Sequence, residues 1–203
     1  MSEPTSRFAT VSAAILVGGR AEPTQVGASR LAVAGVANTT RIANRLVRLF
    51  EDVMLVGADS PPEAPGRRVA DVAGPECALR GVVSALEAAR AERVLVVACD
   101  LPLISSELLL ALVAWPEADL VLPRTRDGLQ PSCALFRRDA ALPIARTRLA
   151  DGRLALRALA GALETSEIGP DDVARIDPLG SALTSVNTPA LLERAEALLS
   201  DPE

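Results

Sequence analysis

Apolar residues in this chain gather into short, nearly continuous runs. Residues 93–100 (RVLVVACD) form the strongest run, and residues 12–18 (SAAILVG) and 52–58 (DVMLVGA) have the same character. Runs of this length, apolar on both faces, are typical of parallel strands that helices cover on both sides. The pattern therefore predicts three buried strands at the centre of a sheet.

Between these runs, apolar residues recur at the three- and four-residue spacing of amphipathic helices. This spacing predicts helices over residues 41–50, 74–91 after an initial turn, 105–115, 139–164 with a break at Asp151-Gly152, and 188–200. Polar side chains that commonly cap helix starts precede three of them, namely Asn38 to Thr40, Ser105, and Thr188 followed by Pro189.

Weaker patterns complete the secondary structure. They predict strands over residues 68–72, 118–125, 131–138 and 173–176, with a turn at Asp127-Gly128. Because strands and helices alternate, we expect an α/β fold with a mostly parallel sheet and helices on both faces. We also expect a flexible segment over residues 1–10 and a single domain over residues 11–203.

Composition narrows the chemistry. The 203 residues carry a net charge of -5, all 21 basic residues are arginine, and histidine, lysine and tyrosine do not occur. The absence of these residues excludes acid-base catalysis by histidine, Schiff-base chemistry on lysine, and zinc sites with histidine ligands. Acidic side chains with a hard metal ion, arginine with phosphates, and backbone amides remain. The acidic balance argues against binding of nucleic acid.

The cysteines, the lengths of the apolar runs and the first ten residues indicate where in the cell the protein is located. Cys77, Cys99 and Cys133 lack the spacing of metal ligands, and we interpret them as buried apolar residues in a reducing compartment. No run approaches the roughly 18 apolar residues that span a membrane. The first ten residues lack a basic segment followed by a long apolar one. We therefore expect a cytoplasmic protein.

Three features at predicted strand ends and helix starts are candidates for function. Gly18 and Gly19 end the first strand, where backbone amides can approach a phosphate. Asp100 ends the strongest strand, at the edge where open α/β sheets bind ligands and where a carboxylate can hold Mg²⁺. Asn187 precedes the last helix. Each also has an ordinary interpretation: a tight turn, a turn before Pro102, and a helix start.

Taken together, five stretches resemble the molybdenum cofactor guanylyltransferases. They are ILVGGR (15–20), GPECALRG (74–81), VVACDLPL (96–103), QPSCALF (130–136) and SVNTP (185–189). The resemblance covers residues 12–199. It implies a Rossmann-like, three-layer α/β/α fold of the nucleotide-diphospho-sugar transferase class, which is also called glycosyltransferase-A-like. It further implies Mg²⁺-dependent transfer of GMP from GTP to molybdopterin or its molybdenum form, with release of pyrophosphate. Other molybdenum cofactor proteins are candidate partners.

The same resemblance implies roles for individual residues. The residues implied to bind the nucleotide are Leu16, Gly18, Gly19, Arg30, Gly74 and Asp100, and Asp100 is also the implied metal ligand. Those for catalysis are Arg20, Arg30 and Asp100. Those for the acceptor substrate are Gln130, Asn187 and, as alternatives for one family arginine, Arg153 or Arg157.

The chain departs from the family pattern in the loop after the first strand. The family's Arg-Met-Gly core is missing, Glu22 and Pro23 stand in the loop, and Arg30 replaces a lysine. Ser185 replaces the first asparagine of the family's Asn-x-Asn-Thr-Pro motif. Two alternatives therefore stay open: a catalytically degenerate protein that binds a pterin or a partner, and a cytidylyltransferase of the same fold.

Overall fold

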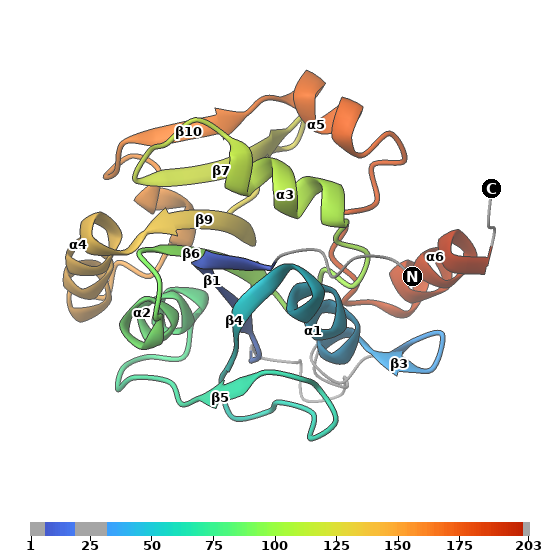
Figure 1. Ribbon diagram of the computed structural model, residues 1–203, viewed down its shortest axis with the longest axis horizontal. Helices are drawn as coiled ribbons and strands as arrows, with labels where there is room; N and C mark the ends of the chain where they lie inside the picture. Colours follow the sequence, from blue (N-terminus) through green and yellow to red (C-terminus); the bar gives the residue numbers. More distant parts are fainter. Residues whose placement is uncertain (1–6, 19–31, 201–203) are drawn as a thin grey trace.

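One mixed sheet runs through the protein (Figure 1). The computed structural model describes residues 7–18 and 32–200. The sheet has eight strands, in the order β10-β7-β9-β6-β1-β4-β5, and β8 pairs with β7. Its strands are β1 (Phe8–Leu16), β4 (Phe50–Val56), β5 (Arg67–Val69), β6 (Arg93–Ala98), β7 (Leu120–Thr125), β8 (Gly128–Leu129), β9 (Cys133–Arg137) and β10 (Thr165–Ile168).

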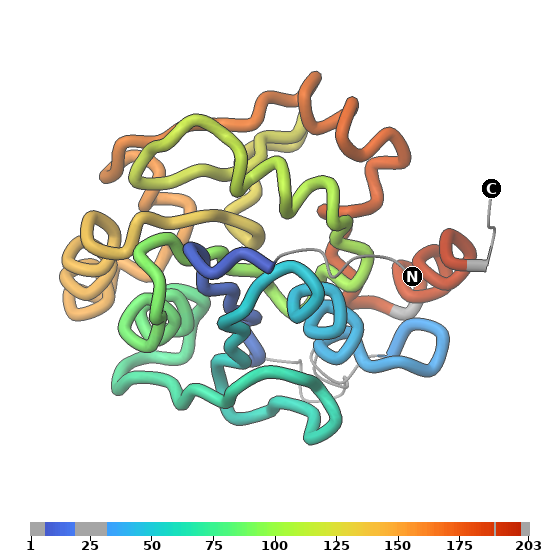
Figure 2. The backbone as a smooth tube through the Cα atoms, in the orientation of Figure 1, coloured from blue at the N-terminus to red at the C-terminus, as the bar shows by residue number. Residues whose placement is uncertain are grey.

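Helices cover the sheet, and a small hairpin lies beside it. The helices are α1 (Asn38–Leu49), α2 (Ala78–Ala88), α3 (Ser106–Ala114), α4 (Arg138–Ala150), α5 (Pro170–Ile176) and α6 (Pro189–Ser200), with a 3-10 turn η1 (Leu156–Leu159). The hairpin consists of β2 (Ala32–Val33) and β3 (Val36–Ala37). In Figure 2 the red α6 lies beside this light blue hairpin, and the backbone amide of Ala34 donates to Glu196 of α6 over 3.0 Å.

The central strands are parallel. β1 lies between β4 and β6, and β4 continues to β5, all in the same direction. β9 is inserted antiparallel between β6 and β7, while β10 pairs parallel with β7. The predicted mostly parallel sheet is therefore confirmed, with one antiparallel strand at its middle.

Alternation along β1 creates two cores, one on each face of the sheet. Ala13 and Ile15 point into the core under α1, α3 and α5, while Ala14 and Leu16 point into the core under α2 and α4. This arrangement confirms the predicted three-layer α/β/α fold. Both cores rest on the same sheet, and the single domain over residues 11–203 stays a prediction.

Several predicted boundaries are corrected. Residues 173–176 are not a strand but the end of α5, which begins at Pro170 with two aspartates in its first turn. The predicted break at Asp151-Gly152 is confirmed: α4 ends at Ala150, and Gly152 takes a φ of +70° and closes the turn. The predicted helix after the break is wrong, since only the 3-10 turn η1 forms there. The strand β10 that follows was not predicted.

The chain's first strand and first helix also differ from expectation. β1 begins at Phe8, within the segment expected to be flexible, and Phe8 packs against Phe50 with ring centroids 5.9 Å apart. Asn38 to Thr40 lie inside the first turn of α1 and are buried, so Ala37 occupies the N-cap position instead. The predicted caps Ser105 and Thr188 are confirmed by bonds from the amides of Leu108 and Leu191.

The buried carboxylate of Asp52 joins three neighbouring strands of the sheet. Asp52 accepts hydrogen bonds from Ser12 Oγ at 2.7 Å and from Arg67 Nε at 2.7 Å. Arg67 in turn donates to the carbonyl of Ala88 at 2.6 Å, and the amide of Arg90 donates to Asp52. The network therefore ties β1, β4 and β5 to the end of α2.

We expect Asp52→Asn to lower the free energy of unfolding at pH 7 by about 2 kcal/mol, since it leaves the Arg67 guanidinium without its charge partner. Burial raises the pKa of Asp52, but the bonds from Arg67 and Ser12 outweigh it and the net pKa is lowered. The stabilisation is thus complete above the unfolded value near pH 4 and is lost as pH falls through the lower folded pKa.

Urea denaturation of the wild type and the variant between pH 3 and pH 7 measures this difference, which should shrink toward low pH. The matched control is Glu87→Gln, because the Glu87–Arg146 pair has an arginine side chain that is 57% exposed. It should cost less than about 1 kcal/mol. A difference for Asp52→Asn that is constant with pH would contradict the assignment.

Candidate functional site

The carboxyl ends of β1, β4 and β6 meet at one edge of the sheet. Leu16 is in register with both Val56 and Ala98. Two further bonds extend the ladder beyond the strands: Val17 N donates to Val56 O at 2.7 Å, and Cys99 N donates to Leu16 O at 3.2 Å. Gly18 follows Val17 and Asp100 follows Cys99 at this edge, where the chain turns after β6. Ligands of open α/β sheets bind at this edge.

Gly57 makes the close approach of two of these strand ends possible. Its φ is +119°, and a Cβ atom built there would lie 1.9 Å from the carbonyl oxygen of Val17. No side chain fits at that distance, so β1 can reach Gly18 along this path only if residue 57 is glycine. The sequence predicted a strand over residues 52–58, which includes Gly57, so the early end of β4 at Val56 and the contact with Val17 are visible only in the fold.

Asp100 is held from both its backbone and its side chain. Its carbonyl accepts from Val186 N at 2.7 Å, and its Oδ2 accepts from the hydroxyl of Ser185. Its Oδ1 is buried and has no hydrogen-bond partner among residues 7–18 and 32–200. One carboxylate oxygen is thus engaged by the protein, and the other makes no hydrogen bond within the described ranges.

The same contacts bring the segment before α6 to Asp100. Val186 is fully buried and packs with Val33, Leu103 and Ala195. Asn187, the next residue, is exposed. The backbone just before Asn187 therefore lies at Asp100, and a common site of Gly18, Asp100 and Asn187 stays a prediction.

The donor set fits a single hard cation. In the described part of the chain, no group of three or more His, Cys, Asp or Glu side chains converges on one point. Mg²⁺ needs no such group, since it binds through one or two carboxylates, keeps several waters and takes substrate phosphate oxygens. The unpartnered Oδ1 of Asp100 is the residue atom that fits such an ion.

Two of the three cysteines lie in the core. Burial raises the pKa of the Cys99 thiol to about 11 and that of Cys133 to about 12, so both stay neutral at physiological pH. This confirms their interpretation as buried apolar residues. Cys77 is half-buried at the N-cap position of α2.

Leu16 packs against α2, and Gly74 lies in the loop before that helix. The side chain of Leu16 is in the core, and Gly81 of α2 comes so close that an added Cβ would lie 3.1 Å from Leu16 Cδ2. Gly74 is exposed in the loop before α2, and its carbonyl accepts from Arg80. Leu16 thus supports the floor of the site by packing, and contact of either residue with a nucleotide stays a prediction.

Gln130 lies near the end of β6. Its loop reaches that strand through Ser132, whose carbonyl accepts from Ala98 N at 2.7 Å. Its side chain donates to Thr125 Oγ1 at 2.9 Å, within its own hairpin. The residue is therefore at the predicted edge, but its side chain serves the hairpin in this structure.

Arg153 and Arg157 follow α4, and both are exposed. Arg153 pairs with Asp151 at 2.6 Å and, with Arg148, lines an open surface hollow of about 280 Å³. Arg157 lies in η1. Their partners and neighbours are local, and the structure does not choose between them as the acceptor-binding arginine.

The remaining predicted residues are not placed. Gly19, Arg20 and Arg30, together with Glu22 and Pro23, lie outside the described residues. The described chain resumes at Ala32 in β2, next to Val33 in the cluster around Val186.

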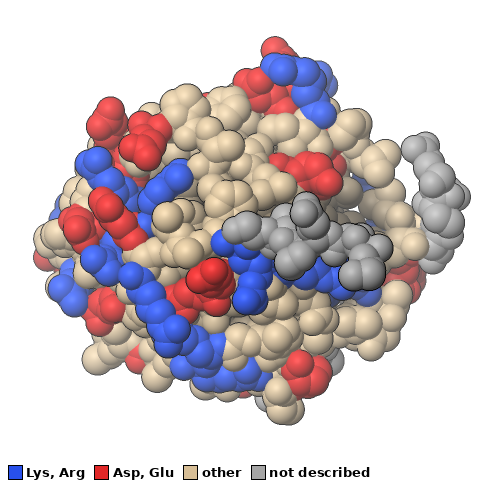
Figure 3. All heavy atoms as spheres, viewed as in Figure 1, with Lys and Arg blue, Asp and Glu red and all other residues tan. Residues whose placement is uncertain are grey.

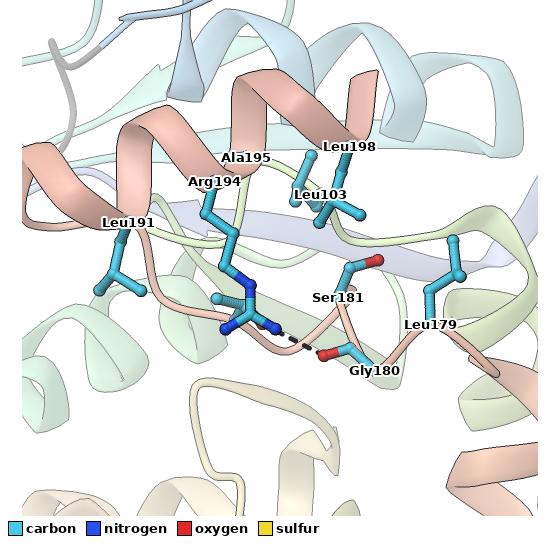
Figure 4. A pocket seen from close by; sticks show the side chains of 9 residues that line it. Leu103, Leu179, Gly180, Ser181, Leu191, Arg194, Ala195 and Leu198 are labelled. Carbon is cyan, nitrogen blue, oxygen red and sulfur yellow. Dashed lines mark hydrogen bonds between the residues drawn. The ribbon is translucent and has the colours of Figure 1, made fainter. Parts of the chain in front are cut away.

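A second hollow lies between α6 and residues 179–184 (Figure 4). Arg194 points toward Gly180 across it, and the other side chains around it are mainly leucines. Its volume of about 30 Å³ is near the share that one water molecule occupies in liquid water. It is therefore too small for a nucleotide.

On the face shown in Figure 3, basic and acidic side chains are interspersed rather than segregated. None of the helices in the described ranges is long and apolar enough to cross a membrane.

Comparison with known proteins identifies the family. The model of the MobA-like NTP transferase domain matches residues 13–166. This chain belongs to that family. The predicted resemblance is thereby confirmed on the part of the chain that contains Gly18, Gly74 and Asp100.

Relatives of this MobA-like chain carry consistent names. A protein of Chloroflexus aggregans named probable molybdenum cofactor guanylyltransferase is 33% identical over 199 residues, which cover 93% of this chain and 95% of that protein. A molybdenum cofactor guanylyltransferase of Desulfosudis oleivorans is 28% identical over 123 residues, or 60% of each chain.

Solved structures confirm the fold class of the MobA-like chain. Molybdopterin-guanine dinucleotide biosynthesis protein A from Archaeoglobus fulgidus superposes with a TM-score of 0.77 at 20% identity, covering 93% of this chain and 98% of that one. A 4-diphosphocytidyl-2C-methyl-D-erythritol synthase from Anaerococcus prevotii gives 0.70 at 16% identity, with 95% and 99% covered. The predicted nucleotide-diphospho-sugar transferase fold is therefore correct.

Proposed function

We propose that this protein transfers GMP from GTP to molybdopterin or molybdenum-molybdopterin and releases pyrophosphate. The observation that carries the proposal is the carboxylate of Asp100 at the carboxyl edge of the sheet, with Oδ1 buried and unpartnered among the described residues. A relative named as a guanylyltransferase is similar over nearly the whole chain and supports the choice of reaction.

In this reaction an oxygen of the acceptor's phosphate attacks the α-phosphorus of GTP. A new P–O bond forms to the acceptor, the bond from the α-phosphorus to the bridging oxygen breaks, and pyrophosphate leaves with that electron pair. The acceptor phosphate is largely ionised at pH 7, since the second pKa of a phosphate monoester is about 6. No side chain has to remove a proton, which suits a chain without histidine.

Positioning and charge are what the protein has to supply. We assign Asp100 Oδ1 to a Mg²⁺ ion. Bound there, Mg²⁺ would neutralise charge on the phosphates. Gly18 and Gly19 would leave backbone amides free to face the nucleotide, with Gly74 on the α2 side. Arg20 and Arg30 are proposed to pair with the phosphates.

For the acceptor side we propose Asn187, Gln130 and either Arg153 or Arg157. Asn187 has the strongest support, because its exposed position directly follows the residues that hold Asp100. Arg153 is supported by the hollow it lines with Arg148. The free thiols Cys77, Cys99 and Cys133 suit the reducing cytoplasm, where we place the reaction.

Pyrophosphate release with Mg²⁺ and molybdopterin tests the proposal, with GTP and CTP compared at equal concentration. We expect release with GTP and at least about tenfold less with CTP, a difference of about 1.4 kcal/mol in transition-state binding. Preference for CTP would favour the cytidylyltransferase alternative. Release with neither nucleotide, alongside an active guanylyltransferase as positive control, would refute catalysis and favour the binding-protein alternative.

A further inference from the structure

We infer that Ser185 is a positioning residue that makes Asp100 a one-oxygen ligand and so favours Mg²⁺ over Ca²⁺. The inference rests on the proposed function, since it takes Asp100 as the cation ligand. It concerns a position where this chain departs from the family motif, and it gives that departure a physical consequence.

The two oxygens of Asp100 have different surroundings. Ser185 donates its hydroxyl to Oδ2, while Oδ1 is buried and unpartnered among the described residues. A hydrogen bond to an ionised carboxylate is stronger than one between neutral groups. Oδ2 is therefore engaged before any cation arrives, and rotation of the carboxylate is opposed.

Both partners of this hydrogen bond sit on fixed backbone. Asp100 is flanked by Cys99 and Leu101, which are 4% and 1% exposed. Ser185 is followed by Val186, which is fully buried and donates its amide to the Asp100 carbonyl at 2.7 Å. The backbone bond does not depend on the Ser185 side chain, so loss of the hydroxyl should free the carboxylate without detaching the segment.

Cations differ in how they use a carboxylate. Mg²⁺ requires near-octahedral geometry at about 2.0–2.1 Å and is satisfied by single oxygens, whereas Ca²⁺ takes 6–8 oxygens at about 2.3–2.6 Å and often both oxygens of one carboxylate. The Ser185 hydrogen bond takes one of the two lone pairs of Oδ2 and fixes the orientation of the carboxylate, which disfavours binding of Ca²⁺ through both oxygens, while Mg²⁺ needs Oδ1 alone. The hydroxyl therefore discriminates between the two ions.

Binding of a non-hydrolysable GTP analogue tests this without turnover. Calorimetry in Mg²⁺ and in Ca²⁺, with no molybdopterin present, gives the ratio of the two affinities for each variant. Ser185→Ala should lower the Mg²⁺ preference by about five- to tenfold, because Ca²⁺ gains a ligand. Ser185→Thr keeps the hydroxyl and should retain the wild-type ratio.

A second variant guards against a folding defect. Ser185→Cys is nearly isosteric, and its thiol is a weak donor, so its ratio should move toward that of Ser185→Ala. An unchanged ratio in both Ala and Cys variants, with binding still dependent on metal and on Asp100, would overturn the role of Ser185 and leave the proposed function intact. Binding of the GTP analogue that does not depend on the metal, or that persists in Asp100→Ala, would overturn both the role of Ser185 and the proposed function.

Discussion

Asp100→Asn is expected to slow GMP transfer by at least about 1000-fold, or about 4 kcal/mol of transition-state stabilisation. The amide oxygen of asparagine can still accept the hydrogen bond from Ser185, and the backbone bond from Val186 is unaffected. The amide NH₂ then replaces Oδ1, and it presents donors to a cation instead of a lone pair. Binding of the metal is lost although the local contacts remain.

For the same reason the fold should tolerate the change, with a melting temperature within about 2 °C of the wild type. Asp177→Asn is the control: Asp177 is a buried aspartate whose carboxylate also accepts a hydrogen bond from the protein, here from the amide of Ala182 at 2.8 Å, but it belongs to a turn after α5. It should alter stability and leave the transfer rate nearly unchanged. A large drop in the melting temperature of Asp100→Asn with little loss of rate would mark Asp100 as a structural residue.

Gly57→Ala is expected to destabilise the protein by about 3 kcal/mol or more. The new methyl group would lie 1.9 Å from the carbonyl oxygen of Val17, so β1 or β4 has to shift. Because Val17 leads directly into Gly18, the shift also displaces the strand end that faces Asp100. Urea denaturation measures the loss of stability, and the transfer rate measures the displacement.

Gly128→Ala is a closely matched control. Gly128 has a φ of +117°, against +119° for Gly57, but nothing lies within 4 Å of the position that a Cβ atom would take there. Both substitutions place an L-residue at a positive φ that costs about 1–3 kcal/mol, and only one adds a collision. Equal losses of stability in the two variants would show that the contact with Val17 relaxes freely, and would refute the requirement for glycine at residue 57.

Local patterns in the sequence predicted the parts of the fold that local chemistry determines. β1, β4 and β6 are continuous apolar runs, and the capping hydroxyls of Ser105 and Thr188 act within three residues of themselves. The position of Asp100 at the carboxyl edge followed from its place at the end of such a run. These features need no knowledge of distant segments.

The wrong predictions concern segments whose secondary structure depends on strand pairing or on the residues that flank them. β10 has the sequence TSEI, which is too polar for a strand on its own, and it is a strand because it pairs with β7. Residues 173–176 have an apolar pattern that suits a strand as well as a helix, but the start at Pro170 with acidic residues after it favours a helix. The sequence therefore contains a signal for a helix at this position.

The most informative contacts of the site were not predictable from one sequence. The bond from Ser185 to Asp100 joins residues 85 positions apart, and the collision that requires Gly57 depends on how two strand ends pack. The motifs indicated which residues to examine, and the fold gave them their relation to one another. Roles for Arg20 and Arg30 remain predictions, because both lie outside the described residues.

Gly18, Asp100 and Asn187 are proposed to form a site for nucleotidyl transfer, and the fate of the two ends of the GTP triphosphate is the sharpest test of that proposal. The experiment is an incubation with molybdopterin and Mg²⁺, using GTP labelled either at the α-phosphate or at the γ-phosphate. We expect the α-label in a guanylylated pterin and the γ-label in pyrophosphate. In Asp100→Asn we expect neither labelled product to form at the wild-type rate. Absence of the α-label from the pterin, with GTP intact or merely hydrolysed, would contradict the proposal.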